Sequence, residues 1–375
     1  MSEFSAGIVG GGQGAFIGAV HRIAAELDSA ARVVAGAMSA DPERARASAK
    51  AWHLDRAYDS FETMAAEEAK REDGIDFVIV ATPNHLHLPV ARAFLEAGIH
   101  VVCDKPLAAS LDEARELADI VERSGRLFAL THAYSGYPLV REARDFVASG
   151  RLGELRKVQV EYNQDWLMEP LERQGNKQAQ WRTDPARSGI SCCVGDIGTH
   201  AKHLLEFISG RKVRSVCAEL TSFVEGRQLD DDASMLLRLE GGARGTLVCS
   251  QIACGEENGL NIRLYGSKAG LEWHQMEPNT LLVKPAGKGW ERFRAGGGYL
   301  GDAAARATRV PAGHPEGYLE AFANLYRDFM ADLRRVRAGE PPLRDYPGII
   351  DGIRGMRFVE AAVESAAKGA VWVDL

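Results

Sequence analysis

Residues 7–15 read Gly-Ile-Val-Gly-Gly-Gly-Gln-Gly-Ala, a short apolar run that ends in a cluster of glycines. Apolar residues then recur at helical spacing, at Phe16, Val20, Ile23, Ala24 and Leu27. This order predicts a buried strand, a tight turn and a helix. The chain therefore begins like one unit of an α/β sheet.

Gly10, Gly12 and Ala15 fit the pattern G-x-G-x-x-G/A. In that pattern the missing side chains let the backbone approach a pyrophosphate at the N-terminus of the helix. A plain glycine turn is the alternative interpretation. Gly14 and Gly18 add further glycines, which leaves open which three positions form the motif.

A second apolar run, residues 32–38, ends at the place where an acid that binds a ribose is expected. Ser39 occupies that place, and Asp41 is better placed to cap the next helix in front of Pro42. A serine does not repel a 2′-phosphate, which Arg44 or Arg46 would then meet. The choice between NAD and NADP stays open.

A third buried strand, residues 75–82, leads into polar side chains at its carboxyl end. We expect Asn84 and His87 to contact a nicotinamide or a substrate, and His85 to begin the following helix. Two histidines two residues apart also suggest a metal. No third ligand of matching type lies nearby, so we predict no metal site.

Residues 100–106 read His-Val-Val-Cys-Asp-Lys-Pro. The valines predict a buried parallel strand, and Pro106 ends it because proline lacks a backbone donor. Lys105 therefore lies at the carboxyl end of a strand, where open α/β sheets bind ligands. A solvated lysine at a loop is the alternative.

The pattern changes after residue 130. Strands and helices alternate up to that point, which predicts a doubly wound parallel sheet in residues 1–133. Strands then follow one another, which predicts an α+β domain in residues 134–375 with an open-faced, mostly antiparallel sheet. We expect these strands at residues 155–166, 213–224, 233–239, 246–253, 262–265 and 271–273, with helices after them.

Composition narrows the class of protein. A net charge of -7 over 375 residues argues against nucleic acid or an anionic membrane as the main partner. The six cysteines show no C-x-x-C spacing and no export signal is visible, so we expect reduced thiols in a cytoplasmic protein. The apolar runs are far shorter than the roughly 20 residues that span a bilayer.

Asp196 and His200 are spaced i, i+4 at the start of a predicted helix, so both can lie on one face. A carboxylate orients an imidazole and keeps it basic, as removal of a hydroxyl proton requires. A capping Asp with a core His is the alternative. His203 would propose a metal with His200, but that face offers no third ligand.

Four ordered segments make the chain resemble the glucose-fructose oxidoreductase, inositol dehydrogenase and rhizopine-catabolism family, Gfo/Idh/MocA. They are the glycine turn, Thr82-Pro83-Asn84 with His87, Asp104-Lys105-Pro106, and residues 196–200 after Trp181-Arg182 and Ser188-Gly189. The family's Glu-Lys-Pro appears here with an aspartate. Its run of glycines after Ser-Gly is replaced by Ile190-Ser191-Cys192-Cys193.

The resemblance implies a Rossmann domain for NAD or NADP, a substrate domain, and Lys105, Asp196 and His200 as catalytic residues. His200 would take a proton from a sugar or polyol hydroxyl, and Lys105 would hydrogen-bond the same oxygen as the carbon passes hydride to nicotinamide. The expected cofactor contacts are Gly10, Gly12, Gln13, Gly14, Ala15, Phe16, Ser39, Thr82, Pro83, Asn84, His87, Asp104 and Lys105.

We expect the substrate to contact the catalytic residues and a group of polar and aromatic side chains. These are Tyr162, Gln164, Asp165, Trp166, Trp181 and Arg182. Core packing is the alternative for the two tryptophans.

The predicted function is an NAD(P)-dependent dehydrogenase or reductase that acts on a secondary hydroxyl of a sugar, inositol or sugar derivative. One alternative keeps the cofactor bound through an internal redox cycle, for epimerisation, elimination or glycoside cleavage. Another is a non-catalytic sensor of sugar and cofactor. We expect a homodimer or homotetramer that assembles through the C-terminal sheet.

Overall fold

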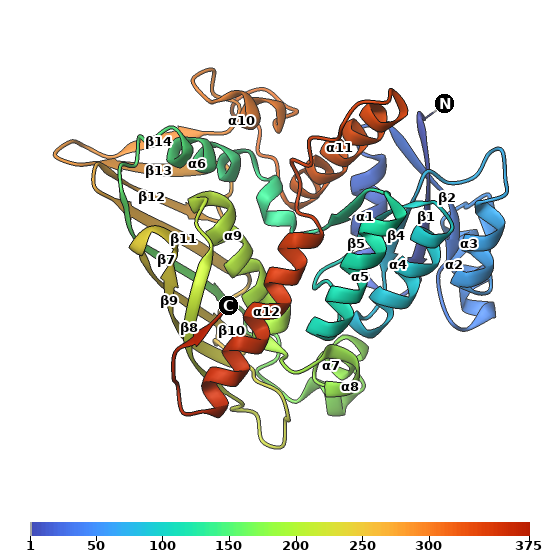
Figure 1. Cartoon of the computed structure of the whole chain (residues 1–375), viewed down its shortest axis with the longest axis horizontal. Coiled ribbons are helices and arrows are strands. Elements are labelled where there is room, and N and C mark those ends of the chain that lie inside the picture. Colours follow the sequence, from blue (N-terminus) through green and yellow to red (C-terminus); the bar gives the residue numbers. More distant parts are fainter. Residues whose placement is uncertain (1) are drawn as a thin grey trace. The chain divides into compact units, whose positions relative to one another are not determined.

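The computed structural model describes residues 2–375, which form two compact units (Figure 1). The first unit holds the chain up to Ala133 together with Phe322–Ile353, and the second holds Tyr134–Ala321 and Arg354–Leu375. The boundary after residue 133 lies where the sequence predicts it. The prediction that all of 134–375 forms one domain is wrong in one respect, because residues 322–353 return to the first unit.

Aromatic packing explains this return. The Tyr326 hydroxyl lies 2.6 Å from Nδ1 of the buried His21, and the Phe329 ring packs edge-on against Phe77 at 5.4 Å between centroids. These rings belong to the apolar stripe of helix α11 (Tyr318–Arg337). The stripe is readable in the sequence, but the sheet that it covers is not.

The first unit is a six-stranded parallel sheet in the order β3-β2-β1-β4-β5-β6, which confirms the doubly wound prediction. Strand order reverses between β1 and β4, and ligands of such sheets bind at that switch point. The elements are β1 (Phe4–Gly10), α1 (Phe16–Glu26), β2 (Ala31–Ala37), α2 (Pro42–Ala51), β3 (Arg56–Ala57), α3 (Phe61–Glu68), β4 (Phe77–Ala81), α4 (His87–Glu96), β5 (His100–Cys103), α5 (Leu111–Ser124) and β6 (Phe128–Leu130).

The second unit contains a nine-stranded sheet in the order β14-β13-β12-β11-β7-β10-β9-β8-β15. Its pairings are antiparallel except β7 with β10, so the sheet is mostly antiparallel, as predicted. The strands do not pair simply in chain order, because β7 (Leu155–Asn163) lies between β10 (Arg244–Ser250) and β11 (Gly259–Gly266). Which strands pair in a sheet depends on contacts distant in sequence, which alternation alone does not encode.

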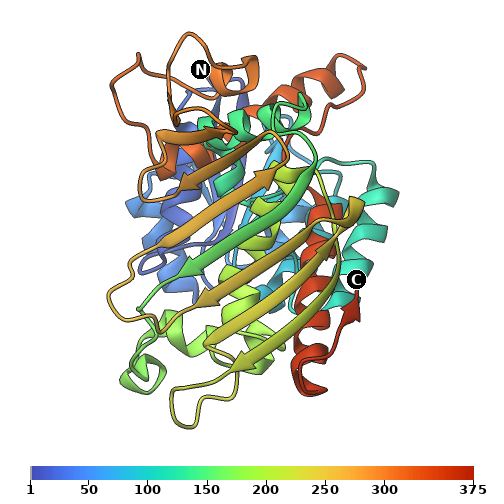
Figure 2. The same ribbon diagram turned by 90° about the vertical axis from the view of Figure 1, so that its left-hand side faces the viewer.

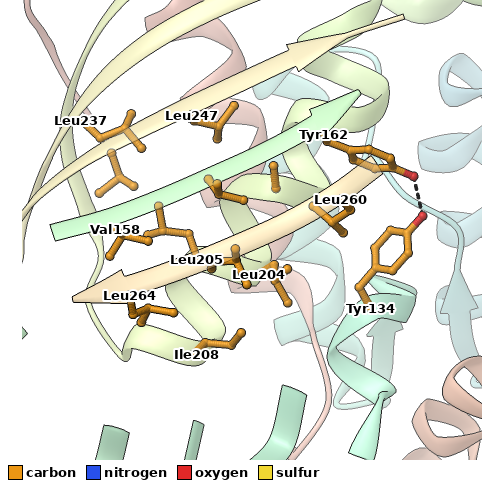
Figure 3. Packing of buried hydrophobic residues seen from close by; sticks show 14 of the residues in the cluster. Tyr134, Val158, Tyr162, Leu204, Leu205, Ile208, Leu237, Leu247, Leu260 and Leu264 are labelled. Carbon is orange, nitrogen blue, oxygen red and sulfur yellow. Dashed lines mark hydrogen bonds between the residues drawn. The ribbon is translucent and has the colours of Figure 1, made fainter. Parts of the chain in front are cut away.

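The helices of the second unit cover one face of this sheet. Leu204, Leu205 and Ile208 of α9 (Thr199–Ser209) belong to the same buried cluster as Val158 and Leu260 of the sheet (Figure 3). Figure 2 looks onto the opposite face, which no helix in residues 134–321 or 354–375 covers. The alternating burial of β9, with Met235 and Leu237 inside and Leu236 outside, confirms the open-faced prediction.

The remaining elements of the second unit are the other strands of the sheet and several short helices. They are α6 (Pro138–Ala148), α7 (Lys177–Arg182), α8 (Pro185–Ser188), β8 (Val213–Thr221), β9 (Asp232–Leu239), β12 (Ala269–His274), β13 (Thr280–Pro285), β14 (Glu291–Arg294), α10 (Asp302–Arg306) and β15 (Val373–Asp374). Helix α12 (Ile349–Ala367) begins in the first unit and belongs to the second from Arg354. None of the helices in residues 2–375 is long and apolar enough to cross a membrane.

Candidate active site

The glycine turn follows β1 at the switch point of the first unit. Gly10 pairs with Ala81 of β4, and a Cβ atom on Gly10 would lie 2.6 Å from the Ala81 carbonyl oxygen. A Cβ on Gly12 would lie 2.7 Å from the Met38 carbonyl oxygen. Both glycines are therefore required by close backbone approach, in agreement with their predicted places in the motif.

The third position of the motif, which the sequence leaves open, is taken by Gly18 rather than by Ala15. Ala15 is the N-cap of α1, whereas a Cβ on Gly18 would lie 2.3 Å from the Gly11 carbonyl oxygen. Close packing of the helix on the turn is the part that a third glycine plays in this motif. Gly18 and Gly11 therefore supply the helix contact of this motif, whereas Ala15 is the N-cap of the helix.

Replacing Gly18 tests this contact. We expect Gly18→Ala to displace α1, lower the free energy of unfolding by about 1–3 kcal/mol and weaken NAD binding at least about tenfold. Thermal unfolding and calorimetric titration with NAD measure the two effects. Ala19→Ser, on the exposed side of the same helix, is the control. Unchanged unfolding and NAD affinity in Gly18→Ala would mean that the turn tolerates the methyl group.

The turn fits a dinucleotide. No side chain caps α1, its first turn carries no acid, and space is open around Gly14, where a Cβ would meet no atom within 4 Å. Thr82 Oγ1, at the carboxyl end of β4, is buried without a hydrogen-bond partner in residues 2–375. Uncapped backbone N–H groups and an unsatisfied hydroxyl suit a phosphate and a polar ligand.

Other predicted cofactor residues frame this edge of the sheet. The Gln13 N–H donates to Ser48 Oγ at 3.1 Å, and Arg44 Nη2 donates to the Gln13 carbonyl at 3.3 Å. Phe16 is 68 % exposed beside the turn, and Pro83 precedes the buried Asn84. Ser48 thus fixes the backbone of the turn at Gln13. The sequence does not predict this contact, because Ser48 lies within a helix rather than in a motif.

Ser39 and Asp41 follow β2. The Asp41 N–H donates to Ser39 Oγ at 3.1 Å, and the Asp41 carboxylate caps α2 by accepting from Glu43 and Arg44 N–H groups, as predicted. Arg46 pairs with Asp59 at 3.2 Å. The end of β2 therefore carries a hydroxyl followed by a carboxylate fixed on the next helix.

His87 occupies a different place from the predicted ligand contact. Its ring is fully buried, with Nδ1 2.8 Å from the Pro106 carbonyl oxygen and Nε2 2.9 Å from that of Thr82. Burial lowers the pKa of His87. The ring thus lies between the loops after β4 and β5, and each of its nitrogens faces a backbone carbonyl oxygen. His85 lies in the short helical turn Asn84–Leu86 before α4.

Asp104 follows β5 directly, at the carboxyl edge of the sheet. Its Oδ1 accepts from Thr131 Oγ1 at 3.0 Å and lies 3.7 Å from Nε2 of His21. Burial raises the pKa of Asp104, but His21 and the charge of Lys105 outweigh it, and the pKa falls to about 2. Asp104 is therefore a carboxylate at neutral pH. Lys105 follows at the end of β5, where the sequence predicts it.

Asp196 lies in a π-helical turn, Val194–Gly198, that leads into α9. The predicted ordinary helix from Asp196 is therefore wrong, because a π turn adds a residue to the repeat and changes which side chains share a face. Its Oδ2 accepts from Arg182 Nε at 3.1 Å and from Gln251 Nε2 at 3.0 Å. The prediction that Asp196 orients His200 stays a prediction.

His200 is buried against aromatic rings in the second unit. The Tyr134 ring packs edge-on to the imidazole at 4.8 Å between centroids, and Tyr162 lies at 6.3 Å. The two tyrosine hydroxyls share a hydrogen bond (Figure 3). Tyr162 also donates to Asn258 Oδ1 at 2.7 Å, and Gln164 donates to the same oxygen at 2.8 Å.

The two tryptophans flank Arg182. Its guanidinium carbon lies 4.2 Å from the Trp181 ring centroid and 5.7 Å from that of Trp166, and both rings are half-buried. Core packing alone does not describe them. Asp165 accepts from the Gly255 N–H at 3.2 Å, so its contact is with a loop.

Sequence reasoning missed Tyr134, Gln251 and Asn258. Each lies in a loop or short turn that carries no motif. The folded sheet brings Gln251 to Asp196, Tyr134 to His200 and Asn258 to Tyr162. Within residues 2–375, no three His, Cys, Asp or Glu side chains are grouped to hold a metal ion.

Comparisons with known proteins agree with this architecture. Residues 4–132 match the model of an oxidoreductase family with an NAD-binding Rossmann fold, and residues 140–272 match that of the GFO/IDH/MocA C-terminal domain. The uncharacterized oxidoreductase YfiI of Bacillus subtilis is 36% identical over 98% of this chain and 95% of its own length.

Solved structures give the same result. An inositol dehydrogenase homolog of Azotobacter vinelandii, in complex with NAD+, has a TM-score of 0.95 and 39% identity over 100% of this chain and 98% of its own. Its complex with NADH and myo-inositol has a TM-score of 0.92. Levoglucosan dehydrogenase of Pseudarthrobacter phenanthrenivorans is 25% identical over 100% of this chain and 99% of its own length.

Proposed function

The chain belongs to the Gfo/Idh/MocA family of NAD-binding oxidoreductases, and from this premise we propose that it oxidises a secondary hydroxyl of a cyclic polyol or sugar. The observation that carries the proposal is the surroundings of two side chains in the second unit, Asp196 and His200. One helical segment presents both Asp196, with two donors on one oxygen, and His200, packed against Tyr134. A carboxylate and an imidazole are the groups needed to bind and deprotonate a hydroxyl.

In this proposal His200 accepts the hydroxyl proton, and Lys105 donates a hydrogen bond to the same oxygen as negative charge develops on it. Asp196 accepts a hydrogen bond from a neighbouring hydroxyl. Bound NAD supplies the acceptor for the two electrons and the hydrogen that leave the carbinol carbon. The flat, half-buried faces of Trp166 and Trp181 offer packing for a ring, and Gln164 offers a polar contact.

We assign the cofactor to the switch point of the first sheet. Gly10 and Gly12, with the uncapped start of the helix α1 that Gly18 packs on the turn, would hold its pyrophosphate. The Asp41 carboxylate, two residues beyond Ser39, disfavours a 2′-phosphate, so NAD is the proposed cofactor. The NAD+ complex of the 39% identical homolog supports this assignment.

Turnover with separate cofactors tests the proposal. Formation of reduced nicotinamide is followed by absorbance, with NAD and NADP in separate arms, against inositols, aldoses and anhydrosugars. The proposal expects turnover with NAD on at least one cyclic polyol or sugar. Cofactor binding without net turnover on any member of the panel would contradict it and favour the internal redox cycle or the sensor.

The open sheet face supports a homodimer or homotetramer. Leu236 is 52% exposed and Val248 36% exposed on neighbouring strands of that face, and apolar side chains gathered on one exposed face are typical of an interface between proteins.

Six free cysteines fit the reducing cytoplasm, where we place the protein.

Charges on that face test the assembly. We expect Leu236→Lys combined with Val248→Lys to lower the solution mass to that of the 40.7 kDa chain, because assembly would bury both charges. Light scattering after size exclusion measures the mass. Leu343→Lys, at a 71% exposed site of the first unit, is the control. An oligomer that survives the double substitution would assign the assembly to another surface.

A further inference from the structure

Cys192 and Gln251 form a buried chain of hydrogen bonds that ends on Asp196. Both residues are fully buried. Cys192 Sγ lies 3.4 Å from Gln251 Oε1, and Gln251 Nε2 lies 3.0 Å from Asp196 Oδ2. The Asp196 N–H also donates to the Cys192 carbonyl at 2.8 Å. Cys192 and Asp196 are thus linked twice, once through the Gln251 side chain and once through their backbones.

The backbones of the two residues are fixed. The Gln251 N–H donates to the Asp231 carbonyl at 2.8 Å, and the Gln251 carbonyl accepts from Leu167 at 3.0 Å. The Cys192 N–H donates to Asp230 Oδ1 at 3.0 Å. Because neither backbone is free to move, the side chains determine how the amide meets Asp196.

An amide has two unlike ends, and only one of them suits a carboxylate. With the oxygen toward Asp196, two acceptors would face each other in a buried site, which is costly. A thiol that donates to the oxygen favours the opposite orientation. Burial raises the pKa of Cys192 well above its usual value, so the sulfur keeps its proton at neutral pH.

We propose that Cys192 and Gln251 are positioning residues, which orient the Asp196 carboxylate toward a substrate hydroxyl. The thiol donates to the amide oxygen, and the amide nitrogen then donates to Oδ2 beside Arg182 Nε. The inference rests on the proposed role of Asp196. It assigns a purpose to the cysteine that stands where the family pattern has glycine.

Substitution of Cys192 tests the donor. Cys192→Ala removes it, so we expect kcat/KM to fall roughly fivefold to tenfold, and Cys192→Ser should recover most of that loss because a hydroxyl also donates. Cys193→Ala is the matched control, because Cys193 is equally buried and lies beside Cys249 instead. Equal losses in the two alanine variants would show simple packing and overturn the inference.

Substitution of Gln251 tests the next link. Gln251→Leu removes one donor to Asp196, so kcat/KM should fall at least about tenfold. The acid limb that follows ionisation of Asp196, which lies below the limb that follows the His200 imidazole, should move to higher pH. The titratable groups near Asp196 include Arg182, Cys192, Tyr134 and Tyr162, and both tyrosine rings also pack against His200. An acid limb that stays in place would contradict the proposed role of the amide.

A measurement that needs no turnover separates this inference from the proposed function. The S–H stretching band of Cys192, identified by its loss in Cys192→Ala, should lie at the low frequency of a donating thiol in wild type. It should rise in Gln251→Leu. If the band does not move, the inference fails whether or not the enzyme turns over. If the band moves but no polyol is oxidised, only the proposed function fails.

Discussion

Lys105→Ala will lower turnover at least about 100-fold and leave the dissociation constant of NAD nearly unchanged. Lys105 lies at the carboxyl end of β5, next to a carboxylate whose pKa is lowered to about 2. Its ammonium group would stabilise charge that develops on the substrate oxygen only as the proton leaves. Removing it therefore raises the barrier of the chemical step rather than weakening binding of the cofactor.

Steady-state kinetics with reduced nicotinamide absorbance measures the loss, and calorimetry measures NAD binding. Lys70→Ala, at an exposed lysine of the same unit, is the control. If Lys105→Ala turned over at the wild-type rate, Lys105 would be a solvated surface lysine. Equal losses in NAD affinity and turnover would instead make it a cofactor ligand.

His200→Ala will also lower turnover about 100-fold or more, because the hydroxyl proton then has no positioned acceptor. The direction in which turnover changes with pH follows from this role. A base must be neutral to accept a proton, so the wild-type rate rises with pH as the imidazole loses its own. In the variant that rise should flatten.

The pH profile of kcat measures the effect, and His203→Asn is the control. His203 lies in the same helix, is buried, and stacks on Phe207 rather than on the tyrosine pair. A His200→Ala variant that keeps both the rate and the pH profile of wild type would make His200 a packing residue.

Local patterns in the sequence predict the first sheet well. The β4 strand is buried at every residue from Phe77 to Ala81, which is what a continuous apolar run in a parallel sheet implies. The same holds for the Asp41 cap, which depends on neighbours two and three residues away. Such features depend on residues that are only a few positions apart in the chain.

Contacts between distant segments are not predicted. The insertion of β7 between β10 and β11, and the return of Phe329 to Phe77, depend on tertiary packing. The site shows the same division. Asp196 and His200 are readable as candidates in the sequence, although the π turn changes the face that their spacing predicts. Gln251, 55 residues beyond Asp196, reaches it only through the folded sheet. The π turn at Asp196 has no local signal that we recognise.

Hydride transfer is tested most directly by following the hydrogen that leaves the substrate. The chain is mixed with NAD and the best polyol or sugar of the panel, which carries deuterium at the reacting carbon, and the reduced cofactor is analysed by mass spectrometry. We predict that deuterium appears in the reduced nicotinamide, with slower turnover than for the unlabelled substrate. A reduced cofactor without deuterium, or a label that exchanges with water, would contradict hydride transfer from a secondary carbinol.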